Sequence, residues 1–233
     1  MHTEIKVHSI QAQILTKLLF KPAARFADLN DQKLETDHFN FHLQSLVKAG
    51  LVIKQESGGY ELTNEGKEFA NRFDTEEQKL ERQPKVSIVV VGTRKQKGKT
   101  QYLVQKRLKN PYFGFYGFVT GKVRWGETIE ECANREFLEE AGLSGDLTLT
   151  EIWHKMDYAT DGNLLEDKVF LRFRAENCKG DLIESFEGGQ NVWLTKEEIA
   201  ELPDLFPDVV RIIESINDKH IRFSEKKFIV EKY

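Results

Sequence analysis

One segment constrains the fold of this chain more than any other. Gly121–Leu143, with the sequence GKVRWGETIEECANREFLEEAGL, carries three glutamates within five residues, namely Glu136, Glu139 and Glu140. On a helix, carboxylates three and four residues apart lie on one side and repel each other, at a cost of about a few tenths of a kcal/mol per pair. Something cationic should offset that repulsion. The segment therefore predicts a rigid helix that faces a cation.

The residue pattern predicts that this helix covers 128–141, with Thr128 as its N-cap and Gly142 closing it. Its apolar stripe consists of residues at helical spacing, Ile129, Ala133, Phe137 and Ala141. The glutamates border this stripe instead of lying opposite it, and Arg135 can reach Glu139 one turn on. Hard divalent cations such as Mg²⁺ prefer oxygen ligands. We therefore interpret the cluster as a metal site, against the alternative of a solvated acidic face.

Composition places the chain among globular proteins. Its 233 residues are 39% hydrophobic and 11% aromatic, enough for one large or two small domains. The two cysteines, Cys132 and Cys178, have no paired spacing and predict neither a zinc site nor a disulfide framework. The first ten residues lack the apolar core of a signal peptide, and the longest aliphatic run, 86–91, is too short to cross a bilayer. We expect a cytoplasmic protein that does not bind membranes.

A change of composition divides the chain in two. Residues 75–85, TEEQKLERQPK, are charged, poor in large apolar groups and followed by a β-rich run. This is typical of a linker. We therefore place one domain at 1–78 and a second at 84–233.

The first part has a mainly helical pattern. Helices are expected over 10–19, over 24–29 and from Thr36 to Gly50, followed by two strands around a Ser-Gly-Gly turn and a helix capped by Thr63. This order resembles a winged helix-turn-helix domain over roughly 5–73, with the third helix in the recognition position. The resemblance implies DNA binding by the outer face of that helix, where we expect His38, His42 and Ser45.

The charge of this part does not favour DNA as a partner. Residues 1–80 hold 10 basic and 12 acidic side chains, a net charge of −2, and the third helix contains no arginine. Few phosphate contacts are then available to drive affinity. The whole chain, with a net charge of −4, also argues against general nucleic-acid coating. A module that packs, recruits a protein or forms a homodimer remains the alternative.

The second part mixes strands and helices. Strands are expected at 86–93, 100–108, 147–158 and 168–175, and helices at 195–202 and 208–216. The final stretch, 221–233, could be another strand, but the sequence does not place it. This irregular order predicts an α+β fold, or an α/β/α sandwich.

The full spacing of the first segment resembles the Nudix box, the signature of the Nudix hydrolase family. Its defining positions are Gly121, five residues, Glu127, seven residues, Arg135-Glu136-Phe137, one residue, Glu139-Glu140, one residue and Gly142-Leu143. The resemblance covers roughly 84–217. It implies the Nudix fold, an α/β/α sandwich whose box forms a loop-helix-loop. It also implies Mg²⁺-dependent hydrolysis, with Mn²⁺ as an alternative, of a nucleoside diphosphate linked to another moiety.

The resemblance also assigns roles within the box. It makes Glu136, Glu139 and Glu140 the metal ligands, with the backbone carbonyl of Gly121. It implies that Glu127 and Arg135 brace the geometry of the loop and the helix that Gly142 closes. One glutamate must act as general base, either in the box, such as Glu139 or Glu140, or outside it.

Residues outside the box are assigned less firmly. Glu187, in the loop FEGGQ, resembles the distal glutamate that many family members place near the metals; the alternative is an exposed loop acid. Arg107 could contact phosphate or base, or could be an exposed arginine at a strand end. Tyr116 and Phe118 belong to an aromatic cluster that could stack on a base or pack in the core. Trp125 is expected at a solvent-shielded rim.

The substrate itself is not determined by the sequence. The leading hypothesis is a Nudix-type pyrophosphohydrolase acting on a nucleotide-derived small molecule. A nucleotide-sensing transcription regulator with a DNA-binding winged helix is the alternative. The complete box and the weakly charged N-terminal part both favour the enzyme.

Overall fold

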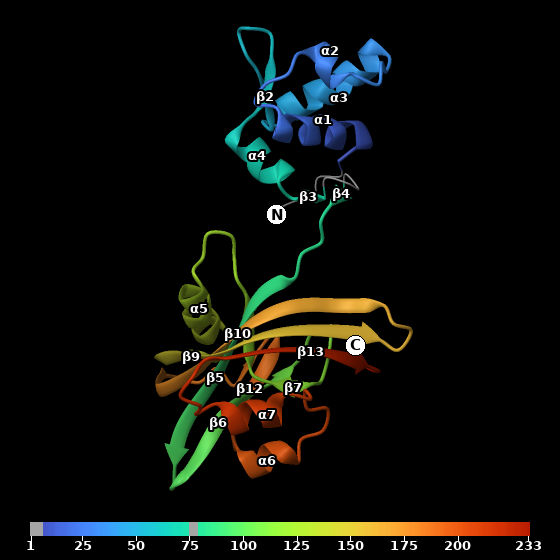
Figure 1. Cartoon of the computed structure of the whole chain (residues 1–233). Helices are drawn as coiled ribbons and strands as arrows, with labels where there is room; N and C mark the ends of the chain where they lie inside the picture. Colours follow the sequence, from blue (N-terminus) through green and yellow to red (C-terminus); the bar gives the residue numbers. More distant parts are fainter. Residues whose placement is uncertain (1–6, 75–78) are drawn as a thin grey trace. The chain divides into compact units, whose positions relative to one another are not determined.

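The computed structural model describes residues 7–74 and 79–233. The chain forms two compact units, Met1–Arg82 and Gln83–Tyr233 (Figure 1). Each unit has its own hydrophobic core, which is why each is described separately. Across the described ranges, no helix is long and apolar enough to span a bilayer.

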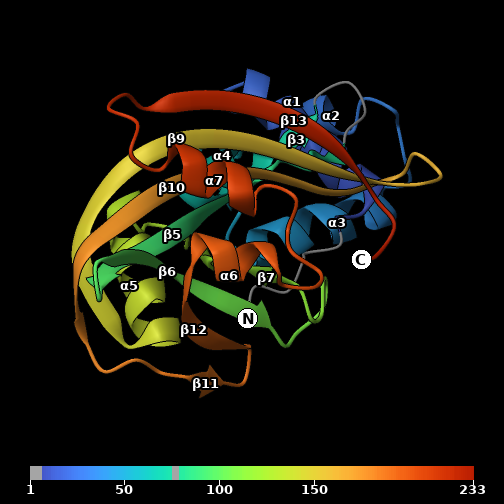
Figure 2. The ribbon, with the colours of Figure 1, turned by 90° about the horizontal axis from the view of Figure 1, so that it is seen from below.

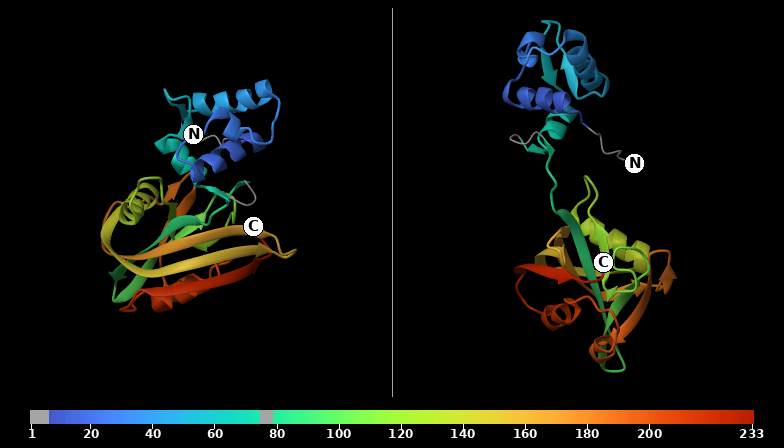
Figure 3. Two further views of the ribbon diagram at one scale, coloured as in Figure 1. Left: turned by 45° about the horizontal axis from the view of Figure 1, so that its top comes forward. Right: turned by 90° about the vertical axis from the view of Figure 1, so that its right-hand side faces the viewer.

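The first unit contains helices and short strands close to the expected positions (Figure 3). Its elements are α1 (Ser9–Phe20), α2 (Phe26–Leu29), α3 (Thr36–Lys48), β1 (Val52–Lys54), β2 (Tyr60–Leu62), α4 (Asn64–Ala70), β3 (Phe73–Asp74) and β4 (Lys79–Leu80). The strands β1 and β2 pair antiparallel, and the Thr63 hydroxyl caps α4 by accepting from the backbone N–H of Gly66. The core is built from the inner faces of the helices, including Ile14, Leu43 and Phe69.

Two sequence expectations for this unit are wrong. The second helix starts two residues late, because Ala24 is held in an isolated bridge to Tyr60 and cannot join it. His42 does not lie on the outer face of α3 but is buried. Its ring stacks on that of His8 with centroids 4.2 Å apart, and its Nε2 lies 3.3 Å from Nε2 of His38. Of the three residues expected on the outer face, only His38 is exposed, and Ser45 is half-buried.

The second unit is built on a nine-stranded mixed sheet. Its strands are β5 (Lys85–Gln96), β6 (Lys99–Arg107), β7 (Tyr116–Gly117), β8 (Val119–Lys122), β9 (Leu143–Ala159), β10 (Leu164–Gly180), β11 (Ser185–Phe186), β12 (Gly189–Thr195) and β13 (Arg222–Val230). The main order is β11-β12-β6-β5-β10-β9-β13, while β7 pairs with β6 and β8 pairs with β5. Figure 2 shows β9, β10 and β13 as long neighbouring strands.

Alternation along β5 divides the core of this unit into two layers. Ile88 and Val90 face α5 (Ile129–Ala141), whereas Val89 and Val91 face the other side of the sheet. That second side is covered by α6 (Lys196–Ala200) and α7 (Val209–Ser215). Figure 1 shows α5 on one face of the sheet and the two short helices on the other. The expected α/β/α layering is therefore present.

The helix that carries the glutamates has the predicted limits. Thr128 is its N-cap and forms a capping box with Glu131, and Gly142 ends it in the left-handed conformation with φ of 72°. A side chain at Gly142 would place its Cβ 2.2 Å from the carbonyl oxygen of Asp181. Glycine is therefore required both by the backbone conformation and by the close approach of this neighbouring loop.

The final strand, which the sequence could not place, forms an edge of the sheet. β13 pairs parallel with β9. His154 of β9 links it to the sheet, because its ring nitrogens lie 2.7 Å from Asp167 of β10 and 2.8 Å from Glu225 of β13. His154 therefore ties β9 to both neighbouring strands, and the carboxylates of Glu225 and Asp167 raise its pKa.

Candidate active site

Gly121 and Glu136 are in direct contact. A Cβ atom on Gly121 would lie 2.0 Å from Cγ and 2.4 Å from Oε1 of Glu136. Because β8 pairs with β5 at this point, with Gly121 opposite Ile88, the strand cannot move aside freely. Only glycine lets the carboxylate of Glu136 rest against the backbone of β8. The first position of the box is therefore a glycine because any side chain there would overlap Glu136.

Arg135 holds three acidic residues at once. Its Nε and Nη2 donate to the two oxygens of Glu127 at 2.6 and 2.9 Å. Its Nη1 donates to Glu136 at 2.6 Å and to Glu139 at 3.2 Å. Glu127 also accepts from the backbone N–H of Arg124 at 2.9 Å. The hydrogen bonds from Arg135, followed by that from Arg124, lower the pKa of Glu127 to about 2. The loop before α5 is thus tied to the second turn of the helix.

The side chain of Glu140 contacts residues other than Arg135. Its side chain accepts from Nε2 of Gln105 at 3.1 Å and lies 3.6 Å from Nζ of Lys109. Its backbone carbonyl accepts from Nδ2 of Asn191 at 2.7 Å, and Gln105 and Asn191 also contact each other at 3.2 Å. Burial raises the pKa of the Glu140 carboxyl, while Gln105 and Lys109 oppose that effect. Gln105 of β6 therefore contacts the carboxylate of Glu140, and Asn191 of β12 contacts its backbone.

The three glutamates are not gathered around one point. Over the residues that the structure describes, no group of three or more His, Cys, Asp or Glu side chains is arranged to hold a metal ion. Glu136 and Glu139 turn to Arg135, and Glu140 turns to Lys109. The donor chemistry nevertheless suits a hard cation, since all three supply carboxylate oxygens. Glu139 is 52% exposed at its side chain and has room to turn.

Glu187 lies in the exposed turn between β11 and β12. The neighbouring Gly188 accepts from the backbone N–H of Leu108, and a Cβ on Gly188 would lie 3.2 Å from Nζ of Lys109. Since the same ammonium approaches Glu140, the turn is on the same side of the unit as that carboxylate. Within the described ranges, no hydrogen bond or ion pair joins Glu187 itself to the box.

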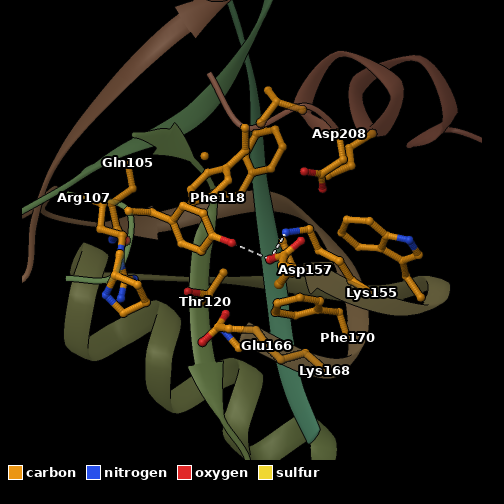
Figure 4. A pocket seen from close by; sticks show the side chains of 18 residues that line it. Gln105, Arg107, Phe118, Thr120, Lys155, Asp157, Glu166, Lys168, Phe170 and Asp208 are labelled. Atoms are coloured by element: carbon orange, nitrogen blue, oxygen red, sulfur yellow. Dashed lines mark hydrogen bonds and ion pairs between the residues drawn. The ribbon is translucent and has the colours of Figure 1, made fainter. Parts of the chain in front are cut away.

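A pocket of about 100 Å³ lies between the sheet and α7 (Figure 4). Arg107 was expected either to contact substrate or to be exposed at a strand end. It lines this pocket and is half-buried. Its Nε donates to the carbonyl of Pro111 at 2.5 Å. Burial lowers the pKa of this guanidinium. Phe118 is 5% exposed and also lines the pocket.

The other two aromatic residues are placed differently. Tyr116 packs against the core near α6 and α7 and does not line this pocket. Trp125 is 84% exposed, so the expectation of a shielded rim is wrong. It sits in the loop that turns at Gly126 with φ of 82°, and its neighbours in that loop are exposed as well.

Several pocket residues were missed by sequence reasoning. They are Gln105 of β6, Lys155 and Asp157 of β9, Glu166 and Lys168 of β10, and Asp208 before α7. They are buried or half-buried charged or polar positions inside strands and at a helix start. A polar residue at an inward position of a strand is the only signal that could have marked them, and it requires knowing which face is inward.

Comparison with known proteins decides the family. The NUDIX domain model matches residues 81–215, more than half of the chain. The chain belongs to the Nudix family. Two curated relatives are similar to this Nudix chain, and both are described as oxidized purine nucleoside triphosphate hydrolase. The Danio rerio protein is 44% identical over 68 residues, 29% of this chain and 41% of the relative. The Mus musculus protein is 38% identical over 89 residues, which are 38% of this chain and 53% of the relative. The chain thus matches about half or less of each relative.

Two solved structures share the fold of the Nudix unit. The MutT protein from Bacillus halodurans aligns with a TM-score of 0.52 at 20% identity, over 62% of this chain and 90% of that one. The NUDIX domain of Shewanella oneidensis NrtR, complexed with ADP-ribose, aligns with a TM-score of 0.51 at 15% identity. The alignment covers 68% of this chain and 99% of that one. At these identities the likeness concerns the fold alone.

Proposed function

We propose that this Nudix chain cleaves a pyrophosphate bond in a nucleoside diphosphate linked to another moiety, with Mg²⁺ as the metal and Mn²⁺ as an alternative. The observation that carries the proposal is the packing of Glu136 against Gly121, with Arg135 fixing the helix behind it. This arrangement places the Glu136 carboxylate of α5 against the backbone of β8. The names of the two curated relatives make purine nucleoside triphosphates, normal and oxidized, the first substrates to try.

In this proposal Glu136, Glu139, Glu140 and the carbonyl of Gly121 hold the metal. When bound, the metal would neutralise phosphate charge and lower the pKa of a coordinated water. For binding, Glu139 must leave Arg135 and Glu140 must leave Lys109. Arg135 keeps its two bonds to Glu127 and so continues to fix the helix against the loop. Lys109, once released, is a cation available to a phosphate group.

The general base remains to be assigned among the glutamates. Glu139 is exposed and forms ion pairs with Arg135 and Arg124, and it would orient a water once it leaves them, whereas Glu140 is held by Gln105. Glu187 lies in a turn beside Lys109 and could approach the same phosphates after movement of that turn. Arg107 would contact the substrate from the wall of the pocket, beside Phe118. Tyr116 would contact it only outside this pocket.

The test is turnover with a matched pair of variants. Glu140→Gln removes a ligand charge at constant volume, and Glu130→Gln makes the same change at an exposed position on the first turn of α5. With Mg²⁺ and a panel of nucleotides, we expect Glu140→Gln to lose more than about 100-fold in kcat/KM, because even residues that only orient metal ligands contribute 10- to 100-fold. Glu130→Gln should stay near wild type. Equal turnover of the two variants would refute the metal site.

We propose that the N-terminal unit is a winged-helix-like module over 1–78 that packs or binds a protein partner. Its support is the order of three helices, a hairpin and a fourth helix. The exposed positions of α3 include Asn40, Phe41 and Gln44, and the last turn carries Lys48 as its one basic residue. An apolar ring and uncharged amides suit a protein surface better than a phosphate backbone.

A further inference from the structure

Asp157 of β9 is a buried carboxylate with only one oxygen satisfied. It is 2% exposed. Its Oδ2 accepts from the Tyr112 hydroxyl at 2.6 Å and from Nζ of Lys155 at 2.5 Å. Its Oδ1 is buried and has no hydrogen-bond partner among the described residues. A buried acceptor without a donor is costly, so the position calls for a partner that the chain itself does not supply.

This carboxylate lines the pocket between the sheet and α7. Figure 4 shows it in the wall, with the Lys155 ammonium directed at it. Aromatic rings make up much of the remaining lining, namely Phe118, Trp153, Phe170 and Phe206. The pocket measures about 100 Å³. A single water needs about 10–15 Å³, so the pocket is larger than one water requires. Its aromatic lining suits stacking on a planar ring.

Two residues that line the pocket are neighbours of the glutamate site. Gln105 lines it and also donates to Glu140 at 3.1 Å. Thr120 lines it as well, and the next residue is Gly121, against which Glu136 packs. A ligand with a planar ring in the pocket can therefore extend its other end toward the carboxylates of α5.

The other carboxylates of the pocket already have partners. Glu166 is paired with Lys168, and Asp208 accepts from Nη2 of Arg172 at 3.1 Å. Among the pocket-lining acids that the structure describes, Asp157 alone has a buried oxygen without a partner. A donor on a ligand would therefore satisfy the one buried acid oxygen of this pocket that the described residues leave unpaired.

We propose that Asp157 is a specificity-determining residue that accepts, through Oδ1, a hydrogen bond from an N–H on the six-membered ring edge of a purine base. The inference rests on the proposed function in one respect, since the base would belong to the nucleotide that is hydrolysed. Tyr112 and Lys155 act as positioning residues, because their bonds to Oδ2 fix the direction in which Oδ1 points. Bases without such an N–H leave Oδ1 unpaired and bind weakly.

The substitution Asp157→Asn replaces the hydrogen-bond acceptor at the position of Oδ1 with a donor. Tyr112 and Lys155 both donate, so the amide oxygen of asparagine will take the place of Oδ2. The amide nitrogen then occupies the place of Oδ1 and presents a donor instead of an acceptor. Asp161→Asn is the matched control, because Asp161 is an exposed acid in the turn between β9 and β10 and lies outside the pocket.

The experiment measures nucleoside binding by calorimetry without metal, so that it does not depend on hydrolysis. Guanosine and adenosine carry N–H donors on the six-membered ring edge, and purine riboside carries none. Wild type and Asp161→Asn should bind at least one of the two donors about 10- to 100-fold more tightly than purine riboside, the range for a hydrogen bond to a charged group. Asp157→Asn should abolish that preference. Thermal unfolding reports whether each variant is folded.

The outcomes separate this inference from the proposed function. If wild type binds purine riboside as tightly as both donors, or binds none of the three, the role of Asp157 is wrong even without a folded variant. Hydrolysis that depends on Glu140 would then still support the enzyme. If instead the binding preference depends on Asp157 but no nucleotide is hydrolysed, the role of Asp157 is supported and the proposed reaction is refuted.

Discussion

Arg135 sets the charge balance of the box at the scale of single residues. It donates to Glu127, Glu136 and Glu139, and its hydrogen bonds to Glu127 lower the pKa of that carboxyl. The same guanidinium offsets the repulsion among these acids, which are crowded on one helix. A metal ion that binds Glu136 and Glu139 must compete with it. The cationic offset that the sequence requires is thus supplied in part from within the helix.

Glu127 gives a pH-dependent test of that balance. Its pKa falls from 4.5 to about 2 in the folded protein, chiefly through Arg135. A lowered folded-state pKa stabilises the fold above the unfolded-state value and loses this effect as the pH falls. We expect Glu127→Gln to lower the free energy of unfolding at pH 7, with the difference from wild type shrinking between pH 4.5 and about 2. Urea titrations at several pH values measure it. A difference that is constant with pH would contradict the ion pair.

Gly121 gives a steric test. An alanine Cβ would overlap Glu136, with the closest atom at 2.0 Å. We expect Gly121→Ala to displace that carboxylate, to destabilise the protein by about 1–3 kcal/mol as overpacking does, and to weaken Mn²⁺ binding measured by electron paramagnetic resonance. Gly59→Ala is the control, because its Cβ would meet no atom closer than 3.8 Å. Normal Mn²⁺ affinity in Gly121→Ala would show that Glu136 does not need its present position.

The residues around the box show what sequence can and cannot predict. The helix limits, its caps and the contact of Arg135 with Glu139 follow from spacing along one element, and the structure confirms them. Gln105 and Asn191 contact Glu140 from β6 and β12, 35 and 51 residues away in sequence. Such contacts depend on strand order, which local pattern does not contain. His42 was misplaced for the same reason, since α1 covers the side of α3 that was expected to be exposed.

At the scale of elements, α5 is held to the sheet by its apolar stripe. Phe137 is 1% exposed and packs close to Gly92 of β5, whereas the adjacent Leu138 is 57% exposed. We expect Phe137→Ala to lower the free energy of unfolding by about 3–5 kcal/mol through cavity formation. Leu138→Ala, on the outer face, should change it by about 0.5 kcal/mol or less. Chemical denaturation of the two variants measures both changes in the free energy of unfolding. Similar losses would mean that α5 does not pack as described.

One histidine of β9 contacts the edge strand β13 through an acidic side chain. Asp167 and Glu225 raise the pKa of His154 above 6.5 in the folded protein. A raised pKa stabilises the fold fully below the unfolded-state value, and the effect is lost as the pH rises through the folded-state value. We expect His154→Gln to be less stable than wild type at pH 6, with the gap narrowing at higher pH. His220→Gln, exposed before β13, is the control and should show no such trend. A gap that widens with pH would overturn this account.

At the scale of the whole molecule, the chain has two units with separate cores. The core of the first is built from α1, α3 and α4 and their neighbours, and the two cores of the second lie on opposite faces of its sheet. Every box residue and every residue of the pocket lies in the second unit, Gln83–Tyr233. The chemistry proposed for the chain therefore does not require any side chain of the first unit.

Deleting residues 1–78 tests this division. Because the second unit buries its own apolar residues, we expect the remaining chain to fold and to keep kcat/KM within about threefold of the full chain, a difference under 1 kcal/mol. Full-length protein should bind duplex DNA weakly and with little sequence preference at physiological salt, since residues 1–80 carry a net charge of −2 and α3 has no arginine. Kinetics of the truncated chain and a gel-shift selection measure the two parts. Recovery of one discrete site bound at nanomolar concentration, and released by a nucleotide, would make the regulator the better account of this molecule.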